Sequence, residues 1–459
     1  MIHRYQKKGL NFVLDVNSGA VHLLDDISYA VSGLLDENMG DTCPQSIIDA
    51  LSDYTADEIR EAYDELYELK KAGQLFAQDD YIDVSRYIPV NAPVKALCLH
   101  VAHDCNLRCK YCFASTGDFG QGRKIMPPEI AKKAIDFVIA RSGVRHNIEV
   151  DFFGGEPLMA WDTVTQTVDY ARSLEEKYNK KFRFTITTNG LLLDEDKRKY
   201  INENMDNCVL SLDGRREVND EFRKTVAGTG SYDTIVPKFK ALVDERDPNL
   251  DYYARGTFTS HNLDFAEDVL SIADAGFDRL SVEPVTADPG CGYDLTEDDL
   301  PKIEAEYDRL TDIMLERKKE GKPFTFFHFM VDLDQGPCVV KRLRGCGAGY
   351  EYVAVTPDGD IYPCHQFVGK DEFKQGSVLD QSFNMDIAQT FAGMNIYSRP
   401  KCQKCWAKFY CSGGCSAANY NMIHDMNDSY DLGCEMERKR LECAIYLKAM
   451  DKICANQSK

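Results

Sequence analysis

The sequence has no long hydrophobic run. A membrane-spanning helix needs about 18 or more consecutive apolar residues, and no such stretch occurs among the 459 residues. The opening segment, MIHRYQKKGLNFVLDVNSG, also lacks the apolar core of a secretory signal peptide. We therefore expect a soluble protein of the cytoplasm without a membrane partner.

Positive charge is also in short supply. The 54 Lys and Arg residues stand against 75 Asp and Glu, which gives a net charge of −21 and an isoelectric point near 4.9. A protein of this charge repels the phosphate backbone of nucleic acids and the surface of anionic membranes. We therefore expect no nucleic-acid partner.

Cysteine, in contrast, is abundant. The chain has 17 Cys, and a protein without an export signal stays where thiols are kept reduced. Metal ligation is therefore a better interpretation than a disulfide framework, wherever local spacing supports it. Ten of the 17 lie between Cys338 and Cys454, in a segment too rich in Cys to fold through apolar burial alone. We expect bound metal to contribute part of its folding free energy.

The length predicts about three domains, at roughly 150 residues each. In residues 1–90, apolar segments at 12–16 and 21–24 flank an Asn-Ser-Gly turn and predict a β-hairpin. The clearest of three following helices begins with a Thr55/Glu58 capping box and ends at Gly73. A short strand near residues 75–76 would complete a winged-helix-like domain. Its seven Lys and Arg against seventeen Asp and Glu, a charge of −10, argue against DNA binding.

From residue 94 onward, short β-rich runs alternate with amphipathic helical segments. The expected strands are residues 95–101, 148–153, 182–188, 208–212, 252–259 and 279–285. The expected helices include residues 127–141, 161–178, 232–244 and 263–275, with a final helix at about 298–320. This alternation predicts an α/β fold of parallel units, and six units favour a partial barrel, open on one side, over a closed barrel of eight. The rhythm ends beyond residue 322, so we place domains at 1–90, 94–321 and 322–459.

Three cysteines follow the first strand of the barrel. Cys105, Cys109 and Cys112 lie on one loop, and three thiolates so close together can bind three irons of a cuboidal cluster and leave the fourth open. A zinc site or a closed iron–sulfur site is the alternative. It needs a fourth ligand, for which His103 is the local candidate.

The Cys-x-x-x-Cys-x-x-Cys motif, with aromatic Tyr111 before its last cysteine, resembles the radical S-adenosylmethionine (SAM) superfamily. This resemblance implies a [4Fe-4S] cluster whose open iron chelates SAM, so that one electron cleaves SAM to a 5′-deoxyadenosyl radical. Three further segments resemble the superfamily's SAM pocket, and each follows an expected strand. They are Gly154-Gly155-Glu156, Thr188-Asn189-Gly190, and Ser211-Leu-Asp-Gly with Arg223 nine residues later. The resemblance implies SAM contacts from Gly154, Gly155, Glu156, Ser211 and Arg223, with Thr188 to Gly190 and Val285 as weaker candidates.

A second cysteine pattern resembles the SPASM domain, which holds two auxiliary [4Fe-4S] clusters. It comprises Cys346, Gly359, Cys364, Cys402, Cys405, Cys411, Cys415 and Cys434. The resemblance assigns Cys402, Cys405, Cys411 and Cys434 to one cluster, and Cys346, Cys364 and Cys415 to the other. Cys338 either completes the second cluster or leaves that iron free for a substrate thiolate. A pair of zinc sites is the alternative.

Six cysteines have no place in either pattern. We expect most of them to be small hydrophobic residues of the core. They are Cys43, Cys98, Cys208, Cys291, Cys443 and Cys454.

The first domain lies in front of the segments that resemble the radical SAM and SPASM domains. A small winged-helix-like domain in this position resembles the RiPP recognition element, which binds the leader of a ribosomally made peptide. An extended leader would add a strand to the exposed edge of the hairpin sheet. A structural cap or a dimerisation domain is the alternative.

Three segments together resemble the SCIFF maturases, which join a cysteine sulfur to a threonine of a small cysteine-rich precursor peptide. They are GLNFVLDVNSGAVHLLDDISYAV, CNLRCKYCFA and RGCGAGYEYVAVTPDGDIYPCHQFVG. The resemblance implies thioether formation and a reductant of the flavodoxin or ferredoxin type. One alternative is a sulfatase-maturing enzyme or another SPASM peptide dehydrogenase. Sulfatase-maturing enzymes have an aspartate where this chain has His365, after Cys364. A non-enzymatic iron–sulfur sensor is the other alternative.

Overall fold

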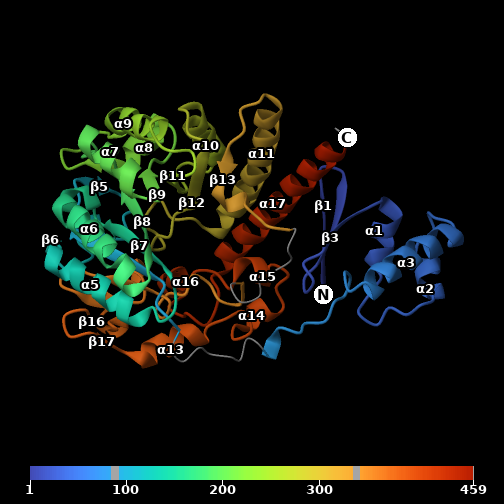
Figure 1. The fold of residues 1–459 in the computed structure, drawn as a ribbon. Helices are drawn as coiled ribbons and strands as arrows, with labels where there is room; N and C mark the ends of the chain where they lie inside the picture. Colours follow the sequence, from blue (N-terminus) through green and yellow to red (C-terminus); the bar gives the residue numbers. More distant parts are fainter. Residues whose placement is uncertain (84–91, 334–341, 458–459) are drawn as a thin grey trace.

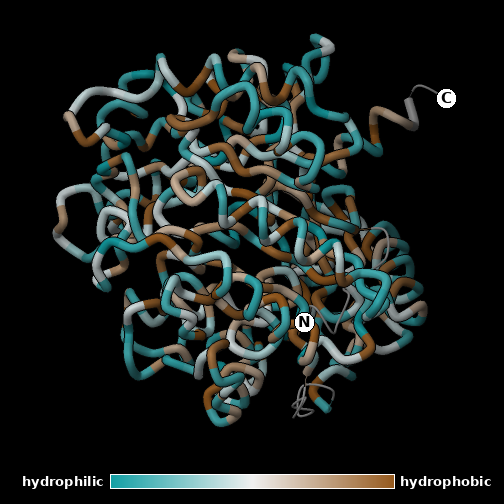
Figure 2. The backbone as a smooth tube through the Cα atoms, turned by 60° about the vertical axis from the view of Figure 1, so that its left-hand side comes forward, coloured by the Kyte–Doolittle hydropathy of each residue, from teal (hydrophilic) through white to brown (hydrophobic). Residues whose placement is uncertain are grey.

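A computed structural model describes residues 1–83, 92–333 and 342–457. The chain forms an open α/β barrel, a small module at its amino end and a carboxy-terminal part that extends the barrel sheet (Figure 1). In the described ranges, no helix combines the length and the apolar character that crossing a membrane requires. Figure 2 shows hydrophobic and hydrophilic residues mixed along the whole chain.

The amino-terminal module consists of a three-stranded antiparallel sheet and three helices. The sheet has the order β1-β2-β3 and the hairpin predicted from the sequence is its β2–β3 pair, whereas β1 was not predicted. The capping box at Thr55 and Glu58 is present. The elements are β1 (Ile2–Lys7), β2 (Leu10–Asp15), β3 (Val21–Leu24), α1 (Asp26–Ser32), α2 (Gln45–Ala50) and α3 (Ala56–Lys71).

The prediction of a short strand at residues 75–76 was wrong. Helix α3 ends in a tight turn in which the Gln74 N–H donates to Leu69 C=O (2.9 Å) and Gly73 has a φ of +72°. After such a turn, the next apolar residue usually packs back on the helix. Leu75 does so, since it is 1% exposed in the core of the module. Leu75 is therefore apolar because it packs against the end of the helix, and not because it belongs to a strand.

Strand β2 is buried on both faces, which explains its nearly continuous apolar sequence. Val13 packs against the module's own helices. Phe12 and Leu14 point the other way and pack against Ile445 and Tyr446 of the long helix α17 (Asp431–Gln457). In Figure 1, α17 lies between α11 and the module. The module is thereby attached to the rest of the chain through an apolar contact.

The six predicted barrel strands are confirmed. They lie in parallel in the order β12-β11-β9-β8-β7-β4, and the sheet does not close on itself. The strands are β4 (Ala96–His103), β7 (Asn147–Gly154), β8 (Lys181–Thr188), β9 (Asn207–Ser211), β11 (Asp251–Phe258) and β12 (Arg279–Pro284). The predicted helices are also confirmed, as α5 (Pro128–Arg141), α6 (Trp161–Tyr178), α9 (Tyr232–Asp244), α10 (Phe265–Asp274) and α11 (Leu300–Lys319). The chain adds α7 (Glu195–Asn204) and α8 (Arg216–Phe222) between them.

The segment beyond residue 322 continues the barrel sheet at both edges. β13 (Thr325–Phe326) pairs in parallel with β12. At the other edge, β14 (Tyr352–Val355) pairs in parallel with β4, and Tyr352 lies opposite Ala96. β15 (Asp360–Tyr362), β16 (Gly376–Ser377) and β17 (Ser382–Phe383) follow in antiparallel order. An open barrel leaves unpaired main-chain groups at its edges, and these strands pair with them. The carboxy-terminal part is therefore fixed beside β4, whose end carries the first cysteine loop.

Candidate active site

The first cysteine loop is held by a short antiparallel ribbon. After β4, β5 (Leu107–Cys109) pairs with β10 (Arg223–Thr225), and Cys109 lies opposite Arg223. The sequence did not reveal this ribbon, because strands of three residues have no readable periodicity. Main-chain pairing therefore joins the cysteine loop to Arg223, the arginine expected to bind SAM.

One cavity collects the predicted residues. It has a volume of about 240 Å³ and lies at the carboxyl ends of the barrel strands. Its lining includes all three cysteines of the loop and every residue predicted to contact SAM, namely Cys105, Cys109, Cys112, Tyr111, Gly154, Gly155, Glu156, Ser211, Arg223 and Val285. Thr188 and Asn189 also line it, whereas Gly190, the third residue of that segment, does not. The remaining wall includes residues that the sequence did not single out as contacts: Arg255, Glu283, Gln366 and Asn421, together with His365.

Gly154 and Gly155 let two loops approach closely. Gly154 has a φ of +122°, and a Cβ atom there would lie 2.2 Å from the Ala102 carbonyl oxygen. A Cβ on Gly155 would lie 2.1 Å from the Asp104 carbonyl oxygen. Any larger residue would push the loop after β7 away from the cysteine loop, because backbone atoms leave no room for a side chain. The two glycines therefore position bare main chain at the cavity wall.

The Glu156 side chain is used inside the protein. It is 1% exposed and accepts hydrogen bonds from Thr188 Oγ1 (2.7 Å), Asn189 N–H (2.8 Å) and Leu158 N–H (3.0 Å). Burial raises the pKa of Glu156 to about 7, although these donors favour the charged form. The carboxylate thus ties the loops after β7 and β8 together. Asn189 also donates to Cys105 Sγ (3.5 Å), which links this pair of loops to the cysteines.

Asp213 is a buried residue of the site that sequence reasoning missed. It is 0% exposed, and its Oδ2 accepts a hydrogen bond from the Tyr111 hydroxyl (2.6 Å) and lies 3.0 Å from Arg223 Nε. Its Oδ1 accepts from the Thr257 N–H (3.0 Å). The signal was present, because Asp213 belongs to the Ser-Leu-Asp-Gly segment from which only Ser211 was selected. Asp213 orients both cavity residues and offsets the buried charge of Arg223.

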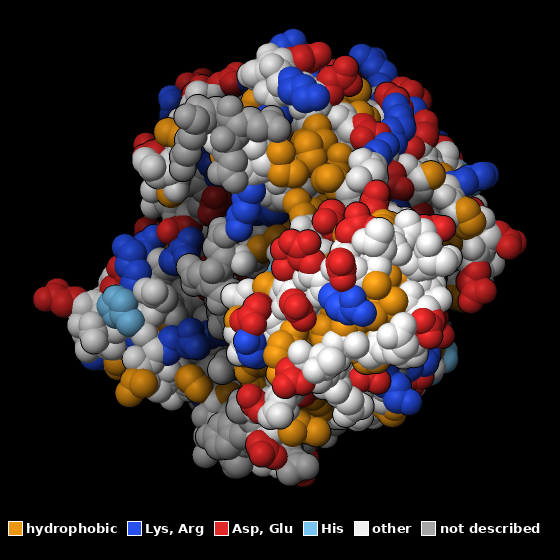
Figure 3. All heavy atoms as spheres, turned by 90° about the vertical axis from the view of Figure 1, so that its right-hand side faces the viewer, with side chains coloured by type: hydrophobic (Ala, Val, Ile, Leu, Met, Phe, Trp, Pro, Cys, Tyr) orange, Lys and Arg blue, Asp and Glu red, His pale blue; other side chains and the backbone are white. Residues whose placement is uncertain are grey.

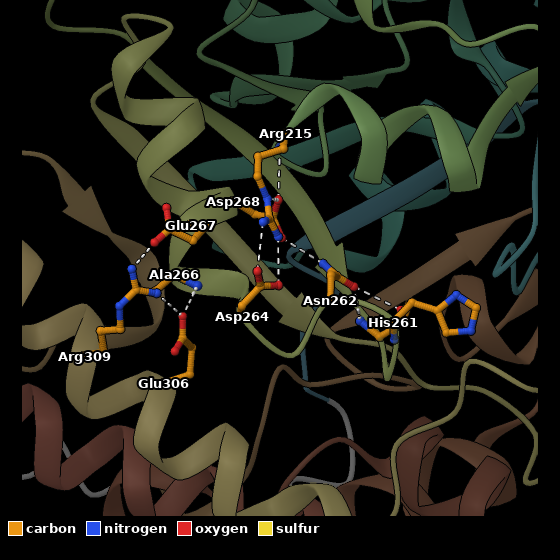
Figure 4. Close-up of polar contacts among 10 residues, drawn as sticks. Arg215, His261, Asn262, Asp264, Ala266, Glu267, Asp268, Glu306 and Arg309 are labelled. Carbon is orange, nitrogen blue, oxygen red and sulfur yellow. Dashed lines mark hydrogen bonds and ion pairs between the residues drawn. The ribbon is translucent and has the colours of Figure 1, made fainter.

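Further ion pairs fix the loop that carries Asp213 (Figure 4). Asp268 of α10 is 0% exposed and accepts from Arg215 Nε (2.8 Å) and Asn262 Nδ2 (3.0 Å). Arg215 also makes two hydrogen bonds to Asp264, both 2.8 Å long. A Cβ on Gly214 would lie 2.2 Å from the Asp268 Cβ atom, so this contact requires glycine. The loop after β9 is thereby anchored to the helix behind it.

Two groups of cysteines are predicted in the carboxy-terminal part. A second, smaller cavity is lined by Cys402, Cys405, Cys411 and Cys434, the four residues predicted to share a cluster. In the other predicted group, Cys364 is buried, which raises its pKa to about 12, whereas Cys346 and Cys415 are exposed. Among the described residues, no group of three or more His, Cys, Asp or Glu side chains has the arrangement of a site for a single metal ion. Cys338 lies outside the described residues.

Comparisons with known proteins agree with this geometry. Residues 99–251 match the model of the radical SAM superfamily, and residues 346–406 match that of the SPASM iron-sulfur cluster-binding domain. The chain contains a radical SAM domain and a SPASM domain. It is 25% identical over 334 residues to a cysteine-type anaerobic sulfatase-maturating enzyme of Clostridium novyi, which covers 68% of this chain and 85% of that one.

Two solved structures share the fold of this radical SAM and SPASM protein. The enzyme anSMEcpe with bound AdoMet (SAM) has a TM-score of 0.64 at 20% identity and covers 80% of this chain and 100% of its own. Streptococcus suis SuiB bound to the precursor peptide SuiA has a TM-score of 0.51 at 17% identity and covers 93% and 97% of the two chains.

The two domains imply three kinds of bound group: SAM, a [4Fe-4S] cluster of the radical SAM domain, and auxiliary iron–sulfur clusters of the SPASM domain. The SPASM match also favours iron–sulfur clusters over the zinc alternative. Together, SAM and the reduced cluster supply a 5′-deoxyadenosyl radical. The residues present fit SAM, the first cluster and one auxiliary cluster, because Cys105, Cys109 and Cys112 share one cavity and Cys402, Cys405, Cys411 and Cys434 share another. The SAM side of the first cavity also offers bare glycine backbone and a fixed arginine.

Three of the six unassigned cysteines are core residues, as predicted. Cys98, Cys208 and Cys443 are 1%, 0% and 0% exposed. Cys43 is half-buried and packs against the core of the amino-terminal module, so four of the six have the expected surroundings, whereas Cys291 and Cys454 are exposed. Cys291 lies on a loop with Gly290 and Gly292, where no apolar layer is available to cover it.

Proposed function

We propose that this radical SAM enzyme matures a small, ribosomally made, cysteine-rich peptide by joining a cysteine sulfur to a threonine carbon. Cys105, Cys109 and Cys112 hold the catalytic cluster, and Gly154, Gly155, Glu156, Ser211, Arg223, Tyr111 and Val285 form the SAM pocket. The observation that carries the proposal is the shared cavity. Its lining combines these residues with His365, Gln366 and Asn421 of the SPASM side, so a bound peptide can meet the radical and the auxiliary cluster region in one space.

His365 favours this reaction over aldehyde formation. It takes the place of the aspartate of sulfatase-maturing enzymes, and its ring packs against Phe153 and Phe113 at centroid distances of 4.9 and 5.5 Å. Burial, with cationic Arg255 nearby, lowers the pKa of His365 to about 4. The imidazole therefore lacks the negative charge that the aspartate of sulfatase-maturing enzymes places at this position. Because a sulfatase-maturing enzyme is among the relatives, a SPASM peptide dehydrogenase is the second candidate function.

The reaction is tested with reconstituted enzyme, SAM, a low-potential reductant and a precursor peptide that contains Cys and Thr. We expect a product lighter by two hydrogen atoms, with a Cys–Thr cross-link located by tandem mass spectrometry. The same peptide with its Thr replaced by Ala serves as the control and should remain unmodified. Formation of formylglycine from Cys or Ser would support the second candidate instead.

The amino-terminal module is proposed to bind the leader of the peptide. Strand β3 has a free edge, because it pairs only with β2 among the described strands. An extended leader can add to this edge through main-chain hydrogen bonds. Figure 3 shows many Asp and Glu side chains on the face that carries the module, and the charge of −10 in residues 1–90 favours a leader with some Lys or Arg.

Replacing Leu23 with proline should weaken leader binding about tenfold. The Asp15 N–H donates to Ala20 C=O (2.9 Å), and the antiparallel ladder then makes Val13 and His22 the next hydrogen-bonded pair. The main-chain groups of Leu23 therefore face the free edge, where proline is tolerated but offers no N–H. Fluorescence anisotropy with a labelled leader measures the affinity.

Leu23→Ala is the matched control, because it shortens the 42% exposed side chain and keeps the N–H. It should bind the leader within about twofold of the wild type. An unchanged affinity of Leu23→Pro would show that the leader does not pair with β3.

A further inference from the structure

The cavity contains one carboxylate with unused hydrogen-bonding capacity. Of the two Glu residues in its described lining, Glu156 is fully engaged by three donors. Glu283 lies at the carboxyl end of β12, and its side chain is 34% exposed. Its Oε2 pairs with Arg255 Nη2, while its Oε1 has only His328 nearby, at 3.8 Å. Glu283 can therefore accept a hydrogen bond or a proton from a molecule in the cavity.

Arg255 keeps this carboxylate charged. It lies on the neighbouring strand β11, faces the same cavity and is 45% exposed. Burial alone would raise the pKa of Glu283, but its neighbours, of which the cationic Arg255 has the largest effect, outweigh burial and leave that pKa below its ordinary value. The side chain is thus ionised before substrate binds.

His328 lies beside Glu283 and does not compete for its proton. Arg440 of α17, which is always protonated, lies with its Nη1 3.3 Å from His328 Nδ1, so this nitrogen must accept. Burial and the charge of Arg440 lower the pKa of His328 to about 3, which keeps the ring neutral. Its one proton is therefore on Nε2, which lies 3.1 Å from Ser281 Oγ and faces Glu283. At 3.8 Å, Nε2 is too far from Glu283 Oε1 for a hydrogen bond, so this oxygen stays available to a molecule in the cavity.

We propose that Glu283 is the catalytic proton acceptor for the reacting sulfur of the peptide, with Arg255 as its positioning residue. The inference rests on the proposed thioether formation. That reaction removes two hydrogens: the hydrogen of the carbon leaves as an atom to the 5′-deoxyadenosyl radical, and the hydrogen of the sulfur leaves as a proton. The S–H bond breaks, its electron pair stays on sulfur, and the proton forms an O–H bond with Glu283.

Electrons balance through a one-electron acceptor. The sulfur pair and the carbon radical bring three electrons together, of which two form the C–S bond. The third passes to an oxidant, for which an iron–sulfur cluster of the SPASM domain is the chemical class that the chain provides. A thiol has a pKa of about 8.5 and a carboxylic acid one of about 4.3, so Glu283 cannot deprotonate a free cysteine extensively. The transfer becomes favourable only as sulfur donates electron density to carbon, which couples it to bond formation.

Replacing Glu283 with glutamine tests the proposal in the reconstituted holoenzyme with the full-length peptide. The amide keeps the shape but cannot accept the proton. We expect thioether formation to fall by about 100-fold or more, while 5′-deoxyadenosine formation and hydrogen transfer from a deuterated threonine stay within about threefold. Glu283→Ala should regain part of its thioether formation when formate or acetate is added, because a small carboxylate can occupy the vacated space.

Glu149→Gln is the matched control. Glu149 also pairs with an arginine of the neighbouring strand, Arg183 at 3.7 Å, and is 44% exposed, but it lies at the amino end of β7. It should behave as the wild type and show no response to formate.

The outcomes separate the two proposals. A wild-type enzyme that makes no Cys–Thr cross-link contradicts the proposed function, whatever Glu283 does. If the wild type makes the cross-link and Glu283→Gln does so within about threefold, Glu283 is not the acceptor. Loss of 5′-deoxyadenosine in Glu283→Gln would also overturn the role, since it would assign Glu283 to SAM binding. Loss of the cross-link in His365→Gln with an active Glu283→Gln would assign the proton to His365.

Discussion

Replacing Cys105, Cys109 and Cys112 together with alanine is expected to abolish SAM cleavage and to remove about four irons per chain. The three thiols line the cavity on a loop fixed by the β5–β10 ribbon, and no other cysteine of residues 1–83, 92–333 and 342–457 lines that cavity. Burial raises the pKa of the Cys105 and Cys109 thiols to about 12, so the bound metal must displace their protons. With the ligands gone, neither the cluster nor its electron reaches SAM. Iron and sulfide analysis after anoxic reconstitution, with 5′-deoxyadenosine measured by chromatography, checks both effects.

Cys208→Ala is the control for this experiment. Cys208 is 0% exposed on β9 and is surrounded by the barrel core, so its loss removes a buried sulfur without touching a cluster. Iron content and SAM cleavage should match the wild type. The SPASM cysteines of the triple variant should keep about eight irons if both auxiliary sites hold four. Continued production of 5′-deoxyadenosine by the triple variant would place the catalytic cluster elsewhere.

Replacing Asp213 with alanine is expected to destabilise the barrel by about 3–5 kcal/mol. The change leaves the Arg223 guanidinium, 11% exposed, without its carboxylate partner at 3.0 Å. It also removes the acceptor of the Tyr111 hydroxyl and of the Thr257 N–H, both in a buried setting. The shift of the urea midpoint, followed by near-ultraviolet circular dichroism, measures the loss of stability.

Two further variants separate buried charge from other effects. Asp213→Asn keeps the shape and an acceptor oxygen, so it should lose less than the alanine variant. Glu245→Ala removes a partner of Arg198 (2.7 Å) that is 47% exposed, and should cost less than about 1 kcal/mol. Equal midpoints for Asp213→Ala and Glu245→Ala would show that Arg223 does not depend on Asp213.

The barrel could be predicted from the sequence because its signals are local. Each strand appears as a short β-rich segment, as in residues 182–188, which the structure has within β8 and where buried residues alternate with more exposed ones. Each helix shows one apolar face, and α6 and α9 have the bounds that the periodicity predicted. The candidate site followed, since motifs at the ends of parallel strands meet at one edge of the sheet. All of them line one cavity.

The contacts between distant segments could not be predicted in this way. Asp213 and Arg223 are ten positions apart, but their pairing depends on a turn after β9 and on the β5–β10 ribbon. Glu283 and Arg255 belong to different strands, and only the register of β11 with β12 brings them together. His328 and Arg440 are more than a hundred positions apart and approach each other because α17 packs along α11.

The sequence by itself determined the cysteine sets, the order of the β/α units and the sign of the charge, because spacing, periodicity and composition are properties of the chain. Only the tertiary structure decided which face of β2 packs on α17, that β14 completes the sheet beside β4, and which cavity carboxylate has a free oxygen. These outcomes depend on register and packing between segments far apart in the chain. A side chain such as Glu283 acquires its chemical role from the neighbours that folding places around it.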